Sequence, residues 1–443
     1  MGTGGARRFS KALEFLPQGS LLKEAARQTN CGVPRGVSWL LMIFKLTIAV
    51  AVPALLAAAS PDPKKAGMDP GRLALIPVRM QEFVDRGAVA GVVTLVARHG
   101  TLAELDAVGW QDIEAQKPMR TDTIFQIMSM TKPVTSTGIM ILAEDGKLAL
   151  TDPVEKYLPE FKGQWLIESR EGNRRRTLKA PSRPILIRDL LTHTSGLPED
   201  PPESIRPVFA NFRLTLAEAV SLYSQTPLEF EPGTKFGYSN LGMATLGRII
   251  EVVSGRPYEK FIEERILKPL GMKDTFYFPP EDKLSRIATV YKPPEGGKLE
   301  RAFAEGPGGE RREFRKGAKY PAPEGGLYST ASDLAAFYQM MLNRGALNGQ
   351  RVLSPASVDL MTELQTGNIP APHGLAWVVV TEAFDTLNYQ SIGSYGHGGA
   401  YGTFGWVDPK KDTVEILLIQ RSVWGNFDER NAFWALAASA IRE

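Results

Sequence analysis

A serine and a lysine three residues apart offer the clearest candidate for chemistry in this chain. Ser129 and Lys132 lie in the run IMSMTKP at residues 127–133, and the helical spacing of apolar residues over 134–144 places the serine near the start of a helix. Residues three apart share a helix face, so the amine can reach the hydroxyl. A serine needs a nearby base to become a nucleophile. A lysine is such a base only where burial or a neighbouring cation lowers its pKa.

This spacing alone does not establish a catalytic pair. About one S-x-x-K match is expected by chance in a chain of this length, and Ser20 with Lys23 is such a match near the N-terminus. Without further support, Ser129 is equally well explained as an ordinary helix N-cap. Two further motifs supply that support.

Tyr238 and Asn240 form the second motif, FGYSN at 236–240, which follows the turn-forming run EPG and precedes a predicted helix. The tyrosine is therefore expected on a loop. A phenol beside a lysine can be partly ionised and pass protons between the serine, the leaving group and water. The asparagine amide can orient the lysine and hydrogen-bond the acyl group. In isolation, a packed tyrosine with its hydroxyl hydrogen-bonded would explain Tyr238 better.

The third motif is the run GHGGA at 396–400, which opens a predicted strand near the C-terminus. Gly398 and Gly399 allow a ligand to approach the backbone closely, and Ala400 follows them. Taken alone, His397 is more often a turn residue than a catalyst. The motif is therefore a candidate for substrate binding rather than for proton transfer.

The order of these motifs resembles that of the serine β-lactamase and penicillin-binding superfamily. Within it, the serine and tyrosine motifs are most similar to the class C β-lactamase-related esterases called family VIII carboxylesterases. The likeness covers roughly residues 70–443 and extends beyond the site. It includes IRDLLTHTSGLP at 187–198, YSNLG at 238–242, LGRII at 246–250, LGM at 270–272 and GGLYST at 325–330.

The resemblance implies a role for each motif residue. Ser129 is implied to be the acylated nucleophile, Lys132 and Tyr238 the proton-transfer pair, and Asn240 the residue that orients them. An oxyanion hole from the backbone amides of Ser129 and Ala400 is implied as well.

One position departs from the superfamily's pattern. In β-lactamases and DD-peptidases the third motif begins with a lysine whose charge holds the substrate carboxylate, and here it begins with His397. At its ordinary pKa an imidazole is largely neutral at pH 7 and gains charge near pH 6. We therefore expect weak binding of carboxylate-bearing substrates, undiminished binding of neutral esters, and better relative β-lactam turnover near pH 6. His193, in the segment 187–198, is implied to be structural only.

These residues predict a serine carboxylesterase that hydrolyses short-chain acyl esters through an acyl-enzyme, with weak β-lactam hydrolysis as a side activity. A β-lactamase or a DD-peptidase acting on cell-wall peptides is the alternative, and a penicillin-binding sensor that is acylated without turnover is a third. The chain has no G-x-S-x-G run, which excludes the nucleophile elbow of the α/β-hydrolases. No cofactor is predicted, and the expected partner is a small ester.

The composition of the chain argues against several other kinds of protein. A chain of 443 residues with 43% hydrophobic residues can bury a full core, and a net charge of +3 gives no reason to expect a nucleic-acid partner. The single cysteine, Cys31, excludes an intrachain disulfide and a multi-cysteine metal site. The four histidines lie too far apart for an H-E-x-x-H run, so no metal is expected.

Strands are predicted at both ends of the enzyme-like part. Residues 89–98 and 102–110 are typical of a hairpin, and residues 403–407 and 414–419 of a second strand pair. A C-terminal helix is predicted over 428–442, and helices over 216–223, 246–253 and 258–267.

The resemblance and this pattern together predict an α/β (α+β) fold like that of the β-lactamase and penicillin-binding proteins. An antiparallel sheet would be flanked by N- and C-terminal helices and carry an inserted, mainly helical domain. The predicted divisions are 68–150 with 325–443 for the discontinuous α/β domain, 151–291 for the helical domain and 292–324 for a surface loop or flap.

Residues 1–60 are expected to be a leader. Residues 37–59 are almost wholly apolar and end on Ala57-Ala58-Ala59, a pattern typical of a cleaved secretory signal. The protein is therefore predicted to be periplasmic or secreted. A membrane anchor through residues 37–59, which are long enough to span a bilayer, and a cytoplasmic extension are the alternatives.

Overall fold

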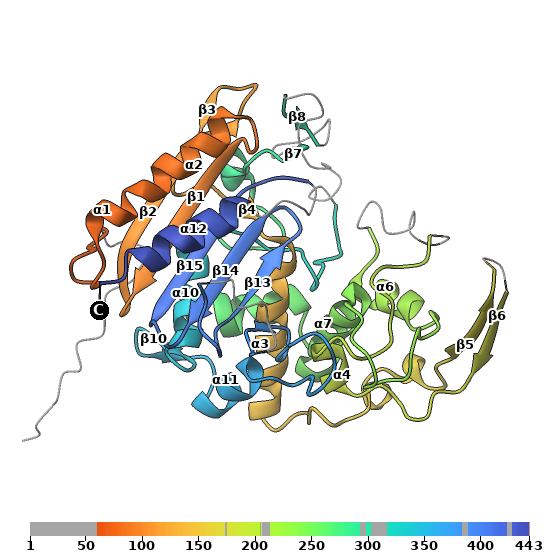
Figure 1. The fold of residues 1–443 in the computed structure, drawn as a ribbon. Coiled ribbons are helices and arrows are strands. Elements are labelled where there is room, and N and C mark those ends of the chain that lie inside the picture. The colour runs from red at the N-terminus through yellow and green to blue at the C-terminus, as the bar shows by residue number, and fades with distance from the viewer. Residues whose placement is uncertain are drawn as a thin grey trace, which may run out of the picture. The chain divides into compact units, whose positions relative to one another are not determined.

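A seven-stranded antiparallel sheet brings together strands from both ends of the described chain (Figure 1). At its centre, β1 (Gly91–Arg98) pairs with β2 (Thr101–Asp112) on one side and with β15 (Thr413–Leu418) on the other. The order across the sheet is β12-β13-β14-β15-β1-β2-β3. The other strands are β3 (Lys117–Pro118), β12 (Val378–Val379), β13 (Tyr395–Gly399) and β14 (Thr403–Asp408).

The computed structural model describes residues 60–172, 175–203, 205, 213–292, 298–302, 317–382, 389–422 and 428–442. All of them belong to one compact unit. No helix among these residues is long and apolar enough to cross a membrane.

The sheet separates two hydrophobic cores, because alternate residues of β1 face opposite sides. Val92 and Val96 pack with the terminal helices in the smaller core, whereas Val93 and Leu95 belong to the larger core behind the sheet. The terminal helices are α1 (Pro70–Leu73), α2 (Leu75–Asp85) and α12 (Asp428–Ser439), which cover one face in Figure 1, and α10 (Ala331–Leu342) packs against the other.

Helix α3 (Thr131–Glu144) runs through the larger core and is buried over most of its length. Gly138 lets it approach α7 (Asn240–Ser254) and α8 (Tyr258–Ile262) closely, because a Cβ atom at this position would lie only 2.9 Å from side-chain atoms of Ile250 and Ile262. The helix that follows the candidate serine is therefore tightly packed against the helical part of the molecule.

The helical part of the molecule also contains shorter elements. Its helix α6 (Leu216–Tyr223) begins with a capping box, in which Thr215 Oγ1 accepts a hydrogen bond from the Glu218 amide at 3.2 Å. The other elements of the described chain are β4 (Phe125–Gln126), η2 (Met128–Met130), η3 (Val154–Lys156), η4 (Pro159–Phe161), β5 (Leu166–Glu171), β6 (Arg175–Lys179), α4 (Ile187–Leu191), η5 (Glu263–Leu267), η6 (Glu281–Arg286), β7 (Tyr291–Lys292), β8 (Glu300–Arg301), β9 (Tyr328–Ser329), β10 (Ala346–Leu347), β11 (Gln350–Arg351) and α11 (Pro355–Thr362).

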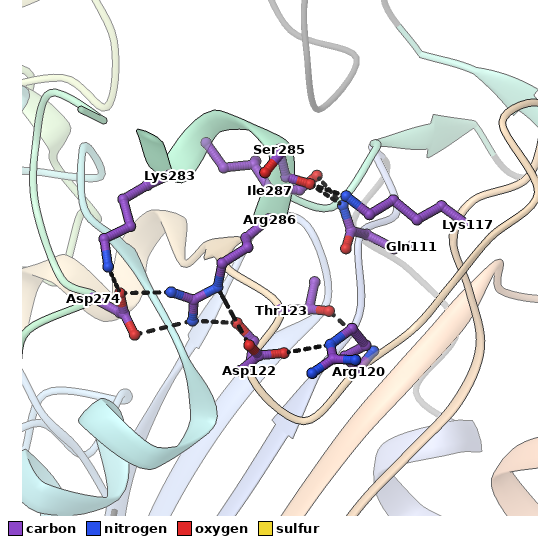
Figure 2. Close-up of polar contacts among 10 residues, drawn as sticks. All are labelled: Gln111, Lys117, Arg120, Asp122, Thr123, Asp274, Lys283, Ser285, Arg286 and Ile287. Carbon is purple, nitrogen blue, oxygen red and sulfur yellow. Dashed lines mark hydrogen bonds and ion pairs between the residues drawn. The ribbon is translucent and has the colours of Figure 1, made fainter. Parts of the chain in front are cut away.

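Charged contacts hold the 3-10 helix η6 against the loop that leads to the candidate serine (Figure 2). Two nitrogens of Arg286 lie 2.8 and 2.9 Å from the carboxylate oxygens of Asp274, and Lys283 Nζ lies 2.8 Å from the same carboxylate. Arg286 also donates to the carbonyl of Asp122 at 2.6 Å. These hydrogen bonds and ion pairs hold residues 274–286 against the segment that precedes β4.

Strand β4 fixes the position of the serine from the other side. It pairs with β9, so that Phe125 lies opposite Ser329, and β9 in turn exchanges backbone hydrogen bonds of 2.9 and 3.1 Å with Phe276. The chain entering the candidate serine is thus held beside the segment that follows residue 324.

The structure confirms the predicted fold class and most predicted elements. Both strand pairs and the C-terminal helix form within two or three residues of the predicted ends. Residues 258–267, predicted as one helix, instead form α8 followed by the π-helical turn η5. The hairpin of β5 and β6 inside the predicted helical domain was not expected.

Some predictions fall wholly or partly on residues outside this description. The leader and the apolar segment 37–59 lie outside it, as do 293–297 and 303–316 of the predicted flap. The proposed domain divisions stay predictions.

Candidate active site

Ser129 lies in the 3-10 turn η2, directly before α3. The preceding residue, Met128, has a φ of +47°, in the left-handed region that residues other than glycine rarely occupy. Backbone strain of this kind is found where surrounding structure holds a functional residue in place. The turn leaves the Ser129 side chain on a cavity wall, whereas Met130 is buried below it.

Lys132 makes three contacts through its amine. Nζ lies 3.0 Å from Ser129 Oγ, 2.8 Å from Asn240 Oδ1 and 2.7 Å from the backbone oxygen of Glu324. The last two atoms are carbonyl oxygens and accept hydrogen bonds only. A neutral amine must therefore spend its two hydrogens on them, which leaves its lone pair for the hydroxyl of Ser129.

The surroundings of Lys132 favour this neutral form. Burial lowers the pKa of the amine more than the carboxylates of Glu324, Glu199 and Asp200 raise it, and the resulting pKa is about 7. A base whose pKa lies near the working pH is present in the right form and still accepts a proton effectively. The sequence analysis required a buried lysine with a lowered pKa if Lys132 is to act as a base, and the structure has one.

Tyr238 completes the cluster around the serine. Lys132 Nζ lies over its ring, 4.6 Å from the centroid, and its hydroxyl lies on the side of Ser129. Burial raises the pKa of the phenol far above its ordinary value, and the nearby Ser129 opposes this only in part. The expectation of a partly ionised tyrosine was therefore wrong: the amine contacts the ring face, and the buried hydroxyl stays protonated near neutral pH.

The loop that carries Tyr238 is held by the segment 193–200. Ser239 caps α7 and donates to the carbonyl of Pro198 at 2.8 Å, and its backbone amide donates to Nδ1 of His193 at 3.1 Å. The ring of His193 lies against that of Tyr238, with 4.5 Å between centroids. Asn240 Nδ2 donates to Asp200 Oδ1 at 2.9 Å, so the amide oxygen is turned towards Lys132.

Strand β13 supplies the opposite side of the site. A Cβ atom on Gly399 would collide with the carbonyl oxygen of Ile127, so only glycine lets the strand end lie beside the turn of Ser129. Gly398 and Ala400 line the same cavity as Ser129. The third motif and the serine motif are thus brought together as predicted.

His397 is buried and neutral. It is 4% exposed, its Nδ1 lies 2.7 Å from the carbonyl of Gly398, and its Nε2 has no hydrogen-bond partner among the described residues. Burial, together with the positive charge of Lys132, lowers its pKa to about 3. The expectation that it gains charge near pH 6 was wrong, because the sequence could not show that the ring is buried.

A cavity of about 960 Å³ contains these groups. Its lining is mostly apolar, with polar groups gathered around the serine, as in many small-molecule sites. Among the described residues, no group of three or more His, Cys, Asp or Glu side chains could hold a metal ion. The lining includes Ser129, Glu199, Asp200, Tyr223, Tyr238, Asn240, Tyr320, Glu324, His373, Val378, Val380, His397, Gly398, Ala400, Phe404, Trp406, Arg430 and Trp434.

Two further residues contribute to this geometry. His193, expected to have a structural role only, supports the tyrosine loop through its ring and Nδ1. Glu324 was placed at the end of a surface loop and instead contacts Lys132. Its position directly before the motif GGLYST was the only available signal.

The model of the family described as Beta-lactamase matches residues 79–439. The chain belongs to the beta-lactamase family. Within this family, Protein Rv1367c of Mycobacterium tuberculosis is 35% identical to it over 361 residues, which cover 77% of this chain and 88% of the relative. Esterase EstB of Burkholderia gladioli is 31% identical over 402 residues, covering 83% and 95%.

A solved structure of the same fold is that of EstCE1, described as a hydrolase with promiscuous acyltransferase activity. It superposes with a TM-score of 0.69 at 27% identity and covers 84% of this chain and 98% of its own. As a beta-lactamase family member with esterase relatives, the chain is a serine hydrolase with the predicted fold class. The roles of individual residues stay predictions.

Proposed function

We propose that this serine hydrolase is a carboxylesterase of the family VIII type, which cleaves short-chain acyl esters through an acyl-enzyme on Ser129. The observation that carries the proposal is the set of three hydrogen-bond contacts that the Lys132 amine makes. Two of its three partners are carbonyl oxygens, so the lone pair of a neutral amine faces the serine hydroxyl.

In the proposed acylation, Lys132 takes the proton from Ser129 as Oγ bonds to the acyl carbon. The backbone amides of Ser129 and Ala400 would bind the oxyanion, which forms next to the N-terminal end of α3. The C–O bond to the alcohol then breaks. Tyr238, protonated and next to Ser129, would give its proton to the leaving alkoxide and regain one from Lys132.

Deacylation repeats these transfers with water as the nucleophile. Water loses its proton to the tyrosine–lysine pair as its oxygen bonds to the acyl carbon. The bond to Oγ breaks and the serine is reprotonated. Asn240 would keep the Lys132 amine in position during both steps, because the amide group of Asn240 is itself held by Asp200.

Neutral esters suit this cavity better than carboxylate-bearing lactams. The position that carries a cation in β-lactamases and DD-peptidases holds the neutral imidazole of His397, so a substrate carboxylate would lose its charged partner there. Apolar lining residues such as Val380, Phe404 and Trp406 would accept an ester's hydrocarbon groups. We therefore expect weak β-lactam hydrolysis as a side activity.

The test compares two chromogenic substrates, p-nitrophenyl butyrate and nitrocefin. We expect the butyrate to be hydrolysed far faster, and Ser129→Ala to lower this rate by about a thousandfold or more, while Ser20→Ala changes nothing. A preference for nitrocefin would favour the β-lactamase or DD-peptidase alternative. A lasting acyl adduct in the intact mass would favour the non-turnover sensor, and a Ser129→Ala enzyme with a tenth of the activity would refute the assignment.

A further inference from the structure

Glu324 contacts the candidate base through its backbone and lines the same cavity. Its carbonyl oxygen accepts a hydrogen bond from Lys132 Nζ at 2.7 Å. Its carboxylate accepts one from the hydroxyl of Tyr320 at 3.1 Å, and that hydroxyl in turn accepts one from Tyr223 at 3.4 Å. All three side chains line the cavity that contains Ser129. The proposed mechanism uses the carbonyl and gives the carboxylate no task.

We propose that Glu324 is a positioning residue whose carboxylate, anchored by Tyr320, sets how firmly Lys132 holds its proton and hence the pH range in which Ser129 is activated. The inference rests on the proposed function, because it requires Lys132 to be the base. It assigns the cavity a carboxylate that tunes the reaction without contacting the ester.

The charges around Lys132 single out this carboxylate. Glu324 is the strongest of the negative neighbours that act on the amine, ahead of Glu199 and Asp200. The two neighbouring imidazoles, His193 and His397, are buried and uncharged at neutral pH. Several titratable groups act on Lys132 or Glu324 from the elements around them. They are Tyr238 on the tyrosine loop, His193, Glu199 and Asp200 on the segment 193–200, His397 on β13, Tyr223 at the end of α6, Tyr258 on α8, Tyr277, and Tyr320 before β9.

Glu324 and Lys132 each affect the pKa of the other. Burial raises the pKa of Glu324, and Lys132 and the hydrogen bond from Tyr320 lower it. A charged carboxylate at this position holds the proton on Lys132 more firmly, whereas a neutral group releases it at a lower pH. The Tyr320 hydroxyl therefore acts through the carboxylate, since its hydrogen bond favours the charged form.

This gives the direction of the expected effect. Glu324→Gln removes the negative charge, so the Lys132 amine should lose its proton at lower pH. The acidic limb of the kcat/KM profile for p-nitrophenyl butyrate should then move to lower pH by about one unit. Glu324→Asp keeps the charge and should leave the limb close to that of the wild type.

Two further variants complete the set. Tyr320→Phe removes the donor to the carboxylate and should shift the limb in the same direction by a smaller amount, which keeps the test decisive if Glu324→Gln does not fold. Glu281→Gln, an identical change at an exposed position of η6, should leave the profile unchanged. A purely structural role for Glu324 predicts a loss of rate at every pH with an unmoved limb, and that outcome would overturn the proposal.

A second readout separates this proposal from the proposed function. Diethyl p-nitrophenyl phosphate reacts when Ser129 Oγ bonds to phosphorus, nitrophenolate leaves and Lys132 takes the proton, so its labelling rate, followed by intact mass, reports activation without ester turnover. A wild type that is labelled but hydrolyses no ester would refute the esterase while the labelling profile still tests Glu324. An acidic limb of labelling that stays in place in Glu324→Gln, or moves to higher pH, would refute the tuning role. A wild type that is never labelled would refute both.

Discussion

The backbone amide of Ser239 donates a hydrogen bond to Nδ1 of His193, across 46 residues of sequence, at 3.1 Å. The acceptor nitrogen must carry a lone pair, so the imidazole is the neutral tautomer with its proton on Nε2. Burial lowers its pKa well below the ordinary value, and the neighbouring His373 and Lys132 lower it further. His193 is thus a permanent acceptor that holds the tyrosine loop rather than a group that titrates with it.

We expect His193→Ala to displace Tyr238 and to lower kcat/KM for esters by about tenfold or more, because a small misplacement of a catalytic group is costly. The loss should fall on kcat rather than on KM, and the pH profile should keep its shape. His99→Ala, at the exposed hairpin turn where the imidazole pairs with Asp412, is the matched control. An unchanged kcat would contradict the supporting role.

Lys132→Ala and Tyr238→Phe should each lower ester hydrolysis by about a thousandfold. The double variant should be little worse than either single one, because the amine and the phenol act as one proton-transfer unit next to Ser129. Steady-state rates of the four enzymes in a double-mutant cycle measure this. Losses that multiply would show that the two groups act independently.

The neutral state of His397 affects the choice between β-lactam and ester substrates. Its pKa of about 3 lies far below the assay range, so between pH 5 and 8 the ratio of nitrocefin to p-nitrophenyl butyrate turnover should not respond to its titration. His397→Lys should raise that ratio by about tenfold, equivalent to about 1.4 kcal/mol, if the added amine stays charged. A folded variant with full ester activity and an unchanged ratio would mean that pocket shape sets the selectivity.

Glu104 lies beside Val96 in the sheet, and Glu415 lies on the other side of the same residue. Burial raises the pKa of Glu104 to about 8, against the opposing hydrogen bond from Thr94. The folded protein therefore binds more protons than the unfolded chain between about pH 4.5 and pH 8, and the free energy of unfolding falls as pH rises through this range.

Glu104→Gln should remove that part of the pH dependence. Its melting temperature should exceed that of the wild type at pH 8.5 by about 2 °C or more, and the difference should shrink towards pH 5, where the wild-type carboxyl is protonated. Glu281→Gln again serves as the exposed control. A difference that is constant across the pH range would indicate altered packing instead of a titrating carboxyl.

The sequence was sufficient where the site depends on local spacing. Ser129 and Lys132 are brought together by one turn of helix. Protonation states were not predictable in the same way. Whether Tyr238 or His397 carries a charge depends on which other segments cover it. Such segments are distant in the sequence, as His193 is from Ser239, 46 residues away.

The position of Glu324 was even harder to predict from the sequence. It is 192 residues from Lys132 in sequence, and no spacing rule links the two. Its placement depends on the pairing of β4 with β9 and on the contacts of β9 with Phe276. Only the folded arrangement of these three segments brings its carbonyl to the amine.

The close approach of Gly399 to Ile127 restricts how this scaffold can acquire new substrates. Any side chain at 399 would press against the peptide just ahead of the nucleophilic turn, so substitutions there would disturb the reacting groups before they altered the choice of ester. The wall formed by Phe404, Trp406 and Trp434 lies in the same cavity without that constraint. A library intended to change acyl preference should therefore vary the aromatic wall and leave the strand end unaltered.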